Sequence, residues 1–487
     1  MRTEASAERP LGARTLTAVG LTVIGLYVAA VIYFMIRTPY DTWATLFVGP
    51  VLFLGTLPVL RRQARREGDD RLFWVLTIAL ALRFFGSLLR MYVAFGLYGG
   101  VADAAGYLGF GARLADRFRG GDFSTGLPTY SDTDFIRLLT AIVFLITGTT
   151  ELGAFFVFSW LGFLGLFLFY RAFVIAVPEG RARTYARLLF FLPSLIFWPS
   201  GVGKDAWMVF GLGIGAYGGA RALTGSLARG VAIGGVGLWL ASLVRPHVAG
   251  LLGISLAAGY MFRRLPDGLG TLRPLVRLAS VLVVAGAALV LISQARQVLE
   301  RSGIDVEAGV ATALEETSAR TQQGGSSFQP AIVRTPLDLP LATLTVLYRP
   351  LPVEANSAQA VATALEGTFL LLLTAVRFRW VVAGLRSVRR QPYVLACVVY
   401  TLLFVVAYSS IANFGILTRQ RVQVLPVFLV LLAIPAARKP RLSGRRSAPG
   451  SDWAGPPTPR DRESGPAGPG SPGPDAAATE RSPGLPA

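Results

Sequence analysis

The sequence predicts an all-α, polytopic membrane protein with about twelve transmembrane helices. Three observations support this prediction: 53% of the 487 residues are hydrophobic, only 15% are charged, and the apolar residues form continuous runs. A helix needs about 20 apolar residues to cross a bilayer, and many of these runs approach that length. The runs lack the alternation of polar and apolar residues that is typical of the strands of a membrane β-barrel.

The positions of the arginines predict the orientation of the apolar runs. Basic loops remain on the cytoplasmic side of a membrane, and five arginines follow the second run within residues 61–71. The protein is therefore expected in a cell inner (plasma) membrane, with both chain ends on the cytoplasmic side. In chain order, the predicted crossings are residues 15–36, 42–60, 72–95, 152–169, 186–198, 206–222, 230–244, 248–262, 278–293, 360–374, 393–411 and 422–434.

Residues 1–436 thus form the predicted membrane domain, with long extracytoplasmic loops at residues 96–134 and 294–358. Residues 136–149 are expected to lie along the outer surface as an interfacial helix, because a crossing there would place the next basic loop outside. Residues 437–487 are rich in Pro, Gly, Ser and Ala. Such a composition cannot bury enough apolar surface to fold, so these residues are predicted to be a disordered cytoplasmic tail.

The formal net charge of +19 does not predict nucleic-acid binding. The arginines lie in short loops between apolar runs and in the tail, which is the distribution that sets the orientation of membrane proteins. Cys397 is the one cysteine and cannot form a disulfide within the chain. The sequence offers no Cys/His cluster for a structural zinc site, and no residue is assigned as a metal ligand.

The segment 191–207, FLPSLIFWPSGVGKDAW, places Lys204 and Asp205 side by side between two apolar runs. An ionised side chain at mid-bilayer costs about 2.5–3.5 kcal/mol, so such charges face water, a cavity or a ligand. One interpretation is a solvated helix N-terminus. The favoured one is an anion site formed by Lys204 and the backbone N–H groups after two glycines. The segment is not a P-loop, because Trp198 replaces the required glycine and Asp205 the Ser/Thr.

Other polar residues at the membrane edges fall on the same outer side. Five of them are arginines, on the face where topology disfavours arginine. A guanidinium group matches the geometry of phosphate, so a phosphate-bearing lipid is the expected ligand. The candidate binding residues are Tyr107, Arg137, Lys204, Asp205, Arg245, His247, Arg349, Glu354, Asn356, Arg419 and Arg421.

Three further features have competing interpretations. Asp103 is either a loop aspartate that caps a helix or a general base that accepts a proton from an acceptor hydroxyl. His247, the one histidine, is either a polar residue at a helix end or part of the site. GLGIGAYGG, from Gly211 to Gly219, is expected to serve helix packing rather than dinucleotide binding, because its glycines repeat every four residues within an apolar run.

Several short motifs resemble the GT-C superfamily of integral-membrane glycosyltransferases and related bacterial polysaccharide polymerases. The motifs are PSLIFWPSGVGKD, Arg349-Pro350 followed by Glu354 and Asn356, Gly415 followed by Arg419-Gln420-Arg421-Val422, and Asp103 with Tyr107 in a long outer loop. The resemblance covers about residues 70–436. It implies transfer of a glycosyl unit from a polyprenyl-phosphate-linked donor to an envelope glycan or glycolipid acceptor at the extracytoplasmic face.

The resemblance also implies roles for individual residues. Asp103 would be the catalytic base or a metal contact, and the lipid phosphate would lie near Lys204, Arg349, Arg419 and Arg421. Many members carry paired acids in the first outer loop, whereas Asp103 has no acidic neighbour, which leaves dependence on a divalent cation open. Two alternative functions are a transporter or flippase of lipid-linked glycan and a non-catalytic membrane component of an envelope complex.

Overall fold

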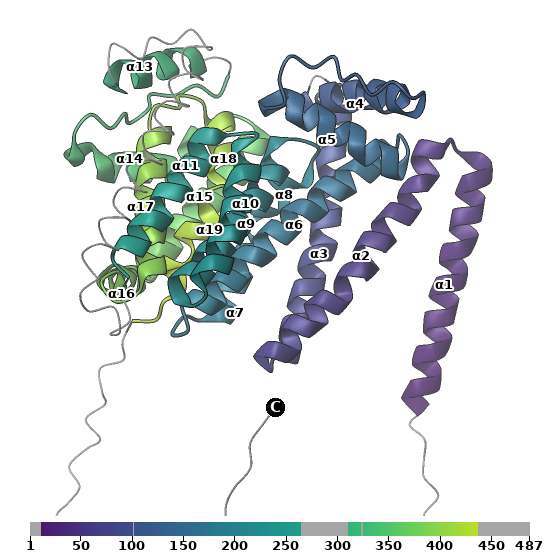
Figure 1. Cartoon of the computed structure of the whole chain (residues 1–487), viewed down its shortest axis with the longest axis horizontal. Helices are drawn as coiled ribbons and strands as arrows, with labels where there is room; N and C mark the ends of the chain where they lie inside the picture. The colour runs from purple at the N-terminus through teal and green to yellow at the C-terminus, as the bar shows by residue number, and fades with distance from the viewer. Residues whose placement is uncertain (1–10, 101, 264–309, 323–324, 437–487) are drawn as a thin grey trace, which may run out of the picture. The chain divides into compact units, whose positions relative to one another are not determined.

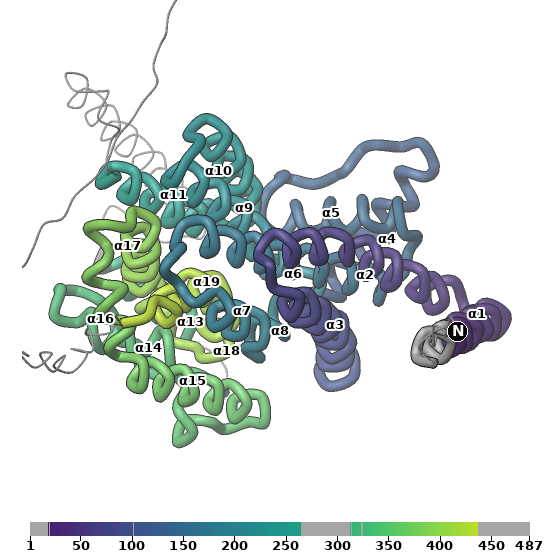
Figure 2. The backbone as a smooth tube through the Cα atoms, turned by 90° about the horizontal axis from the view of Figure 1, so that it is seen from below, coloured from purple at the N-terminus to yellow at the C-terminus, as the bar shows by residue number. Residues whose placement is uncertain are grey.

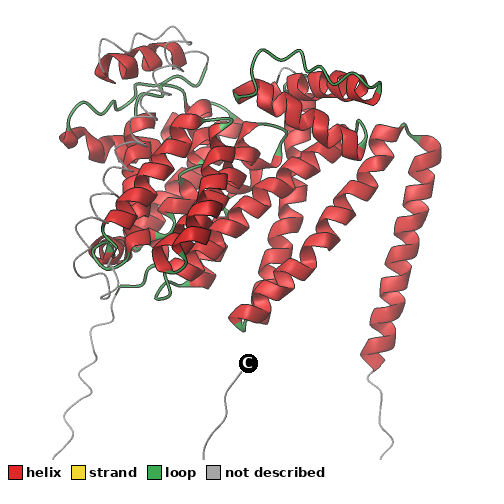
Figure 3. Cartoon of the chain, in the orientation of Figure 1, coloured by secondary structure: helices red, strands yellow, loops and turns green. Residues whose placement is uncertain are grey.

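The structure of the chain is a computed structural model that describes residues 11–100, 102–263, 310–322 and 325–436. Within these ranges the regular structure is helical, and no strand is present (Figure 3). An isolated antiparallel bridge joins Ser327 to Asn413. The all-α prediction is confirmed for this part of the chain. The predicted crossing at residues 278–293 and the predicted tail at residues 437–487 lie outside the described residues.

The described helices form two groups along the chain, one before and one after residues 264–309 (Figure 1). The first group contains α1 (Leu11–Arg37), α2 (Tyr40–Glu67), α3 (Asp70–Met91), α4 (Asp103–Arg119), α5 (Asp132–Thr147), α6 (Glu151–Ala176), α7 (Ala182–Phe191), α8 (Pro193–Phe197), α9 (Lys204–Thr224), α10 (Leu227–Ser242) and α11 (Pro246–Met261). The second group contains α13 (Val310–Thr321), α14 (Leu339–Tyr348), α15 (Ala358–Val376), α16 (Phe378–Ser387), α17 (Pro392–Tyr408), α18 (Phe414–Arg421) and α19 (Leu425–Phe428).

Five helical segments of the described chain are long and apolar enough to span a membrane, and seven if each of two bent pairs counts as one span. The five are Gly20–Arg37, Tyr40–Glu67, Asp70–Leu97, Glu151–Ala176 and Ala358–Val376. The chain is therefore a membrane protein. The expected total of about twelve crossings is not confirmed, because several predicted crossings form broken helices or short ones, such as α10 and α11 with 16 residues each.

The predicted crossing at residues 186–198 is broken at Pro193, and a second proline, Pro199, follows its end directly. Helix α7 ends at Phe191, α8 starts at Pro193, and a single turn runs from Trp198 to Ser200. Proline lacks a backbone N–H and forces the preceding residue toward an extended conformation, which Leu192 adopts with ψ 128°. The break leaves backbone carbonyl groups inside the protein without helical partners.

The side chain of Arg83, in α3, supplies hydrogen-bond donors for those carbonyls. Arg83 is fully buried, and its guanidinium donates to the carbonyl oxygens of Leu195, of Ile196 at 3.3 Å and of Pro199 at 3.1 Å. Buried backbone groups require such partners. Arg83 therefore fixes the broken segment that leads into Lys204 and Asp205.

Helix α9 packs closely between α6 and α10 (Figure 2). A Cβ atom added at Gly218 would lie 2.1 Å from the backbone nitrogen of Gly234 in α10, and one at Gly213 would lie 2.3 Å from the carbonyl oxygen of Gly165 in α6. At Gly211 it would lie 2.9 Å from the nitrogen of Ala241. The prediction that the glycine run serves helix packing is confirmed.

The first predicted outer loop is largely helical. Residues 96–134 contain α4, which packs against α5, and the second predicted loop contains α13 and α14. Helix α5 includes most of the predicted interfacial helix at residues 136–149, and it is not among the candidate membrane spans. In Figure 1, α4 and α13 lie at the upper edge of the helices, and α7 and α16 lie at the lower edge.

Candidate functional site

A cavity of about 620 Å³ lies where α3, α4, the 198–202 segment, α15 and α18 meet. Its polar lining combines charged side chains with amides and hydroxyls. The lining includes Arg90, Asp103, Trp198, Ser326, Gln359, Asn413, Arg419 and Gln420. Two residues of the sequence-predicted site, Asp103 and Arg419, line it directly.

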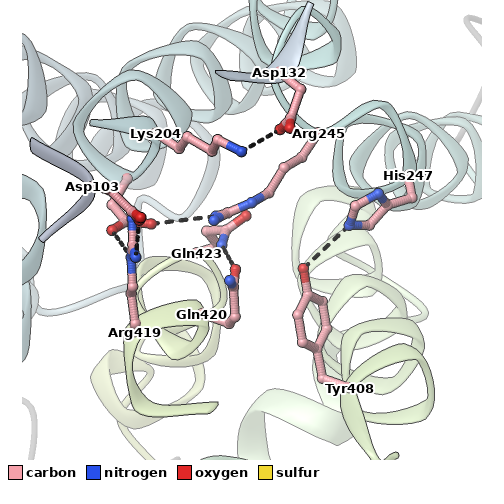
Figure 4. Close-up of polar contacts among 10 residues, drawn as sticks. Asp103, Asp132, Lys204, Arg245, His247, Tyr408, Arg419, Gln420 and Gln423 are labelled. Carbon is pink, nitrogen blue, oxygen red and sulfur yellow. Dashed lines mark hydrogen bonds and ion pairs between the residues drawn. The ribbon is translucent and has the colours of Figure 1, made fainter. Parts of the chain in front are cut away.

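Arg419 joins two aspartates that are far apart in the sequence. Its Nη1 atom donates to Oδ2 of Asp103 at 3.0 Å, and its Nε donates to Oδ2 of Asp205 at 2.5 Å. Arg245 adds a second cation, with Nη1 3.3 Å from Oδ1 of Asp205. In Figure 4, Asp103, Arg419 and Arg245 point toward one another. The ion pairs therefore tie α4, α9, α18 and the start of α11 together at the cavity wall.

The two aspartates have different environments. The side chain of Asp103 is 61% exposed, whereas that of Asp205 is 4% exposed. Burial by itself would raise the pKa of the Asp205 carboxyl, but the charges of Arg419 and Arg245 and the hydrogen bond from Arg419 outweigh it and hold the pKa below its ordinary value. Asp205 is thus a fixed buried anion that orients Arg419, and Asp103 is the carboxylate that can reach a ligand.

Arg90 is a cavity residue that sequence reasoning missed. Its guanidinium lies 4.9 Å from the ring centre of Phe197 and 5.1 Å from that of Trp198. Its buried Nε has no hydrogen-bond partner within the described structure. The sequence does contain a feature that could have identified Arg90, because this residue is near the outer end of the third predicted crossing. It is therefore a further arginine on the face where topology disfavours arginine.

The glycines of the 191–207 segment let its backbone approach both cavity arginines. A Cβ atom at Gly201 would lie 3.2 Å from Nε of Arg90, and one at Gly203 would lie 4.0 Å from Nη2 of Arg419. Gly203 also has a positive φ of 156°, which favours glycine. Gly201 thus permits the close approach of the backbone to Arg90, and Gly203 permits the positive φ at the start of α9.

Lys204 is placed outside the cavity lining. Its Nζ lies 2.6 Å from Oδ1 of Asp132, and its side chain is 17% exposed. The expected anion site at Lys204 is therefore occupied by a carboxylate of the protein. The interaction joins the N-terminus of α9 to that of α5 (Figure 4).

Four further predicted residues do not line the cavity but stabilise the segments around it. They are Arg349, Glu354, Asn356 and Arg421. Nε of Arg349 donates to Oε1 of Glu354 at 2.8 Å, and the guanidinium lies 4.9 Å from the ring centre of Phe328. Asn356 donates to the carbonyl oxygen of Gly325. Arg421 is buried and donates to the carbonyl oxygens of Val346, at 2.9 Å, and Arg349. These bonds hold the 325–328 and 349–356 segments beside α18.

The three remaining predicted residues also lie outside the cavity lining. Tyr107 is buried, and burial together with the charge of Asp103 raises its pKa to about 12, so it remains a neutral phenol. Arg137 pairs with Asp134 at 3.0 Å within α5. His247 lies 3.4 Å from the hydroxyl of Tyr408, to the side of the charged group in Figure 4.

Comparisons with protein-family models, with curated proteins and with solved structures found no match to this chain. Within the described ranges, no group of three or more His, Cys, Asp or Glu side chains is arranged to hold a metal ion. The groups that the site offers for chemistry are one exposed carboxylate, two cavity arginines and several neutral hydrogen-bonding groups.

Proposed function

We propose that the protein transfers a glycosyl unit from a polyprenyl-phosphate-linked donor to an envelope glycan or glycolipid acceptor. The observation that carries the proposal is the placement of Asp103 beside Arg419 and Arg90 in one cavity of a membrane protein. Such a reaction requires a base for the acceptor hydroxyl and cations for the departing phosphate.

The charges of the site suit an anionic ligand. Three arginines (Arg90, Arg245 and Arg419) accompany two aspartates (Asp103 and Asp205), which leaves one excess positive charge. Arg90 has no carboxylate partner at ion-pair distance in the described structure, and its aromatic contacts leave its remaining N–H groups for a ligand. A phosphate at Arg90 and Arg419 would lie beside Asp103.

Donor binding would also free the base. Nη1 of Arg419 donates to Asp103, while its Nε is held by the buried Asp205. A phosphate competes for Nη1 and leaves the Nε interaction intact. The Asp103 carboxylate is then released toward the acceptor, and Arg419 remains oriented by Asp205.

The proposed reaction is a single displacement. The acceptor oxygen attacks the anomeric carbon, its proton passes to Asp103, and the bond between that carbon and the phosphate oxygen breaks with its electron pair on the phosphate. Arg90 and Arg419 stabilise the added charge of the leaving lipid phosphate. Inversion at the anomeric carbon follows. The proposed location is the extracytoplasmic face of the plasma membrane, with both chain ends in the cytoplasm.

A screen for turnover tests the proposal. The purified full chain is supplied with a panel of radiolabelled polyprenyl-phospho-sugars and a crude envelope-glycan acceptor, and release of polyprenyl phosphate is measured. We expect release by the wild type and by Arg117→Gln, a charge removal on exposed α4 surface, and release about 10²–10⁴-fold slower by Asp103→Asn. Equal release by the wild type and Asp103→Asn, or movement of intact donor across vesicles without release, would exclude this reaction.

A further inference from the structure

Helix α16 differs from its neighbours in direction and composition. It follows α15 directly and meets α17 at an angle of 115°. It lies at the lower edge of the helices in Figure 1, opposite α4 and the cavity segments. The segment from Phe378 to Arg390, FRWVVAGLRSVRR, contains four arginines and no acidic residue.

The exposed face of α16 combines an apolar stripe with a basic one. Phe378 and Leu385 are 61% and 45% exposed and lie seven residues apart, which places them on the same side of a helix. Arg379 and Arg386 have the same spacing and are also exposed. An apolar stripe beside a basic stripe is the pattern of a helix that lies in the membrane interface.

The opposite face of α16 is fixed to the helices above it. Gly384 is buried, and a Cβ atom added there would lie 3.2 Å from Leu431. The ring of Trp380 has the guanidinium groups of Arg181 and Arg377 at 4.7 Å each. Arg377 also donates to the carbonyl oxygen of Leu432 at 3.0 Å. The orientation of the exposed stripes is therefore set by packing.

The basic stripe lacks a counter-charge from the protein. In the ranges that the structure describes, Arg379, Arg386, Arg389 and Arg390 form no ion pair, and all four are exposed. The carboxylate of Glu179, close to this region, accepts a hydrogen bond from Gln391 at 3.1 Å. The positive charge is available to an external anion.

We propose that α16 and residues 388–390 form a binding surface for anionic phospholipids. Phe378 and Leu385 enter the acyl boundary, and the four arginines extend to the phosphate groups, as basic side chains at an interface do. The anionic cytoplasmic leaflet supplies such lipids, which agrees with the orientation expected from the arginine-rich loops. The surface is independent of the proposed glycosyl transfer and lies at the other edge of the protein.

Native mass spectrometry of the purified full chain tests this surface, with phosphatidylglycerol and phosphatidylcholine as probes. We expect preferential retention of phosphatidylglycerol, and its affinity should fall about fivefold for each arginine changed to Gln. The combined variant R379Q/R386Q/R389Q/R390Q should lose the preference. The matched variant R117Q/R119Q, on α4 at the opposite edge, should keep it.

A second variant separates lipid binding from folding. R379K/R386K/R389K/R390K keeps the charge and should retain phosphatidylglycerol, because each Lys or Arg near an anionic lipid surface contributes about the same attraction. All variants should keep the thermal unfolding midpoint of the wild type. Equal retention of the two lipids by the wild type, or full retention by the Gln variant, would overturn the proposal.

Discussion

The Nε atom of Arg419 lies 2.5 Å from Oδ2 of Asp205, across 214 positions of sequence. This contact joins the first turn of α9 to α18 and leaves Nη1 of the same guanidinium on Asp103 at the cavity. The geometry assigns the three residues distinct roles. Asp205 orients the guanidinium of Arg419, Arg419 connects the two aspartates, and Asp103 faces the ligand.

Removal of the Asp205 charge should strongly destabilise the protein. Asp205→Asn leaves two arginines near a buried neutral side chain, and loss of one partner of a buried ion pair costs about 3–5 kcal/mol. Thermal unfolding in detergent measures the loss. The matched change Asp132→Asn removes the half-exposed partner of Lys204 and should cost at most about 1 kcal/mol. Equal unfolding midpoints for the two variants would contradict the assignment.

The same ion pairs predict a pH dependence. The pKa of Asp205 is lower in the folded protein than in the unfolded one. Its stabilisation is therefore present above the unfolded pKa of about 3.9 and is lost as the pH falls through the folded pKa. The difference in unfolding midpoint between wild type and Asp205→Asn should shrink with acidification below about pH 4. A constant difference down to about pH 2 would show that the ionised carboxylate is not the source of stability.

Arg83→Met should destabilise the segment that leads to the site. The substitution leaves the carbonyl groups of Leu195 and Pro199 without donors, and each buried unsatisfied group costs about 1–3 kcal/mol. The unfolding midpoint should fall, and limited proteolysis should cut the 192–203 segment faster. An unchanged cleavage rate would show that the proline break is held by other contacts.

The packing of α9 against α10 can be tested with two glycines. Gly218→Ala places a methyl group 2.1 Å from the nitrogen of Gly234, and such overpacking costs about 1–3 kcal/mol. Gly235→Ala, in the same helix pair, meets no atom within 4 Å and should leave the unfolding midpoint unchanged or slightly raised, because alanine favours helix. A comparable loss for both variants would contradict the close approach.

The helical membrane fold and two residues of the candidate site could be predicted from the sequence. The length and continuity of the apolar runs predicted helices in a membrane, and the outer position of Arg419 and Asp103 predicted that both belong to a site. The pairing of Asp205 with Arg419 was not predictable, because a contact across 214 positions of sequence depends on how the helices pack. The ion pair of Lys204 with Asp132 was not predictable for a related reason, because local sequence does not bring the two residues together.

The number of crossings is not confirmed, partly for a more local reason. Residues 186–198 were taken as a crossing although Pro193 interrupts the run after the end of α7, and Pro199 follows directly. Arg90 was missed because it lies inside an apolar run, although the same topology argument that selected the other outer arginines applies to it.

Arg90 should contribute to donor affinity more than to structure. Its guanidinium stacks on Phe197 and Trp198 without an ion-pair partner in the described ranges. Arg90→Gln should therefore weaken binding of polyprenyl phosphate at least about tenfold, the value of a charge-assisted hydrogen bond, and Arg117→Gln should not. Thermal stabilisation by added polyprenyl phosphate measures both. Equal stabilisation of the two variants would remove Arg90 from the site.

The most direct test of the central claim is a single-turnover measurement with saturating polyprenyl-phospho-sugar and acceptor. Asp103→Asn should slow release of polyprenyl phosphate by about 10²–10⁴-fold, the contribution of a general base. Donor affinity should be kept or raised, because Arg419 loses its competing carboxylate. Release at the wild-type rate by Asp103→Asn, or loss of donor binding without a slower chemical step, would contradict the assignment of Asp103 as the base.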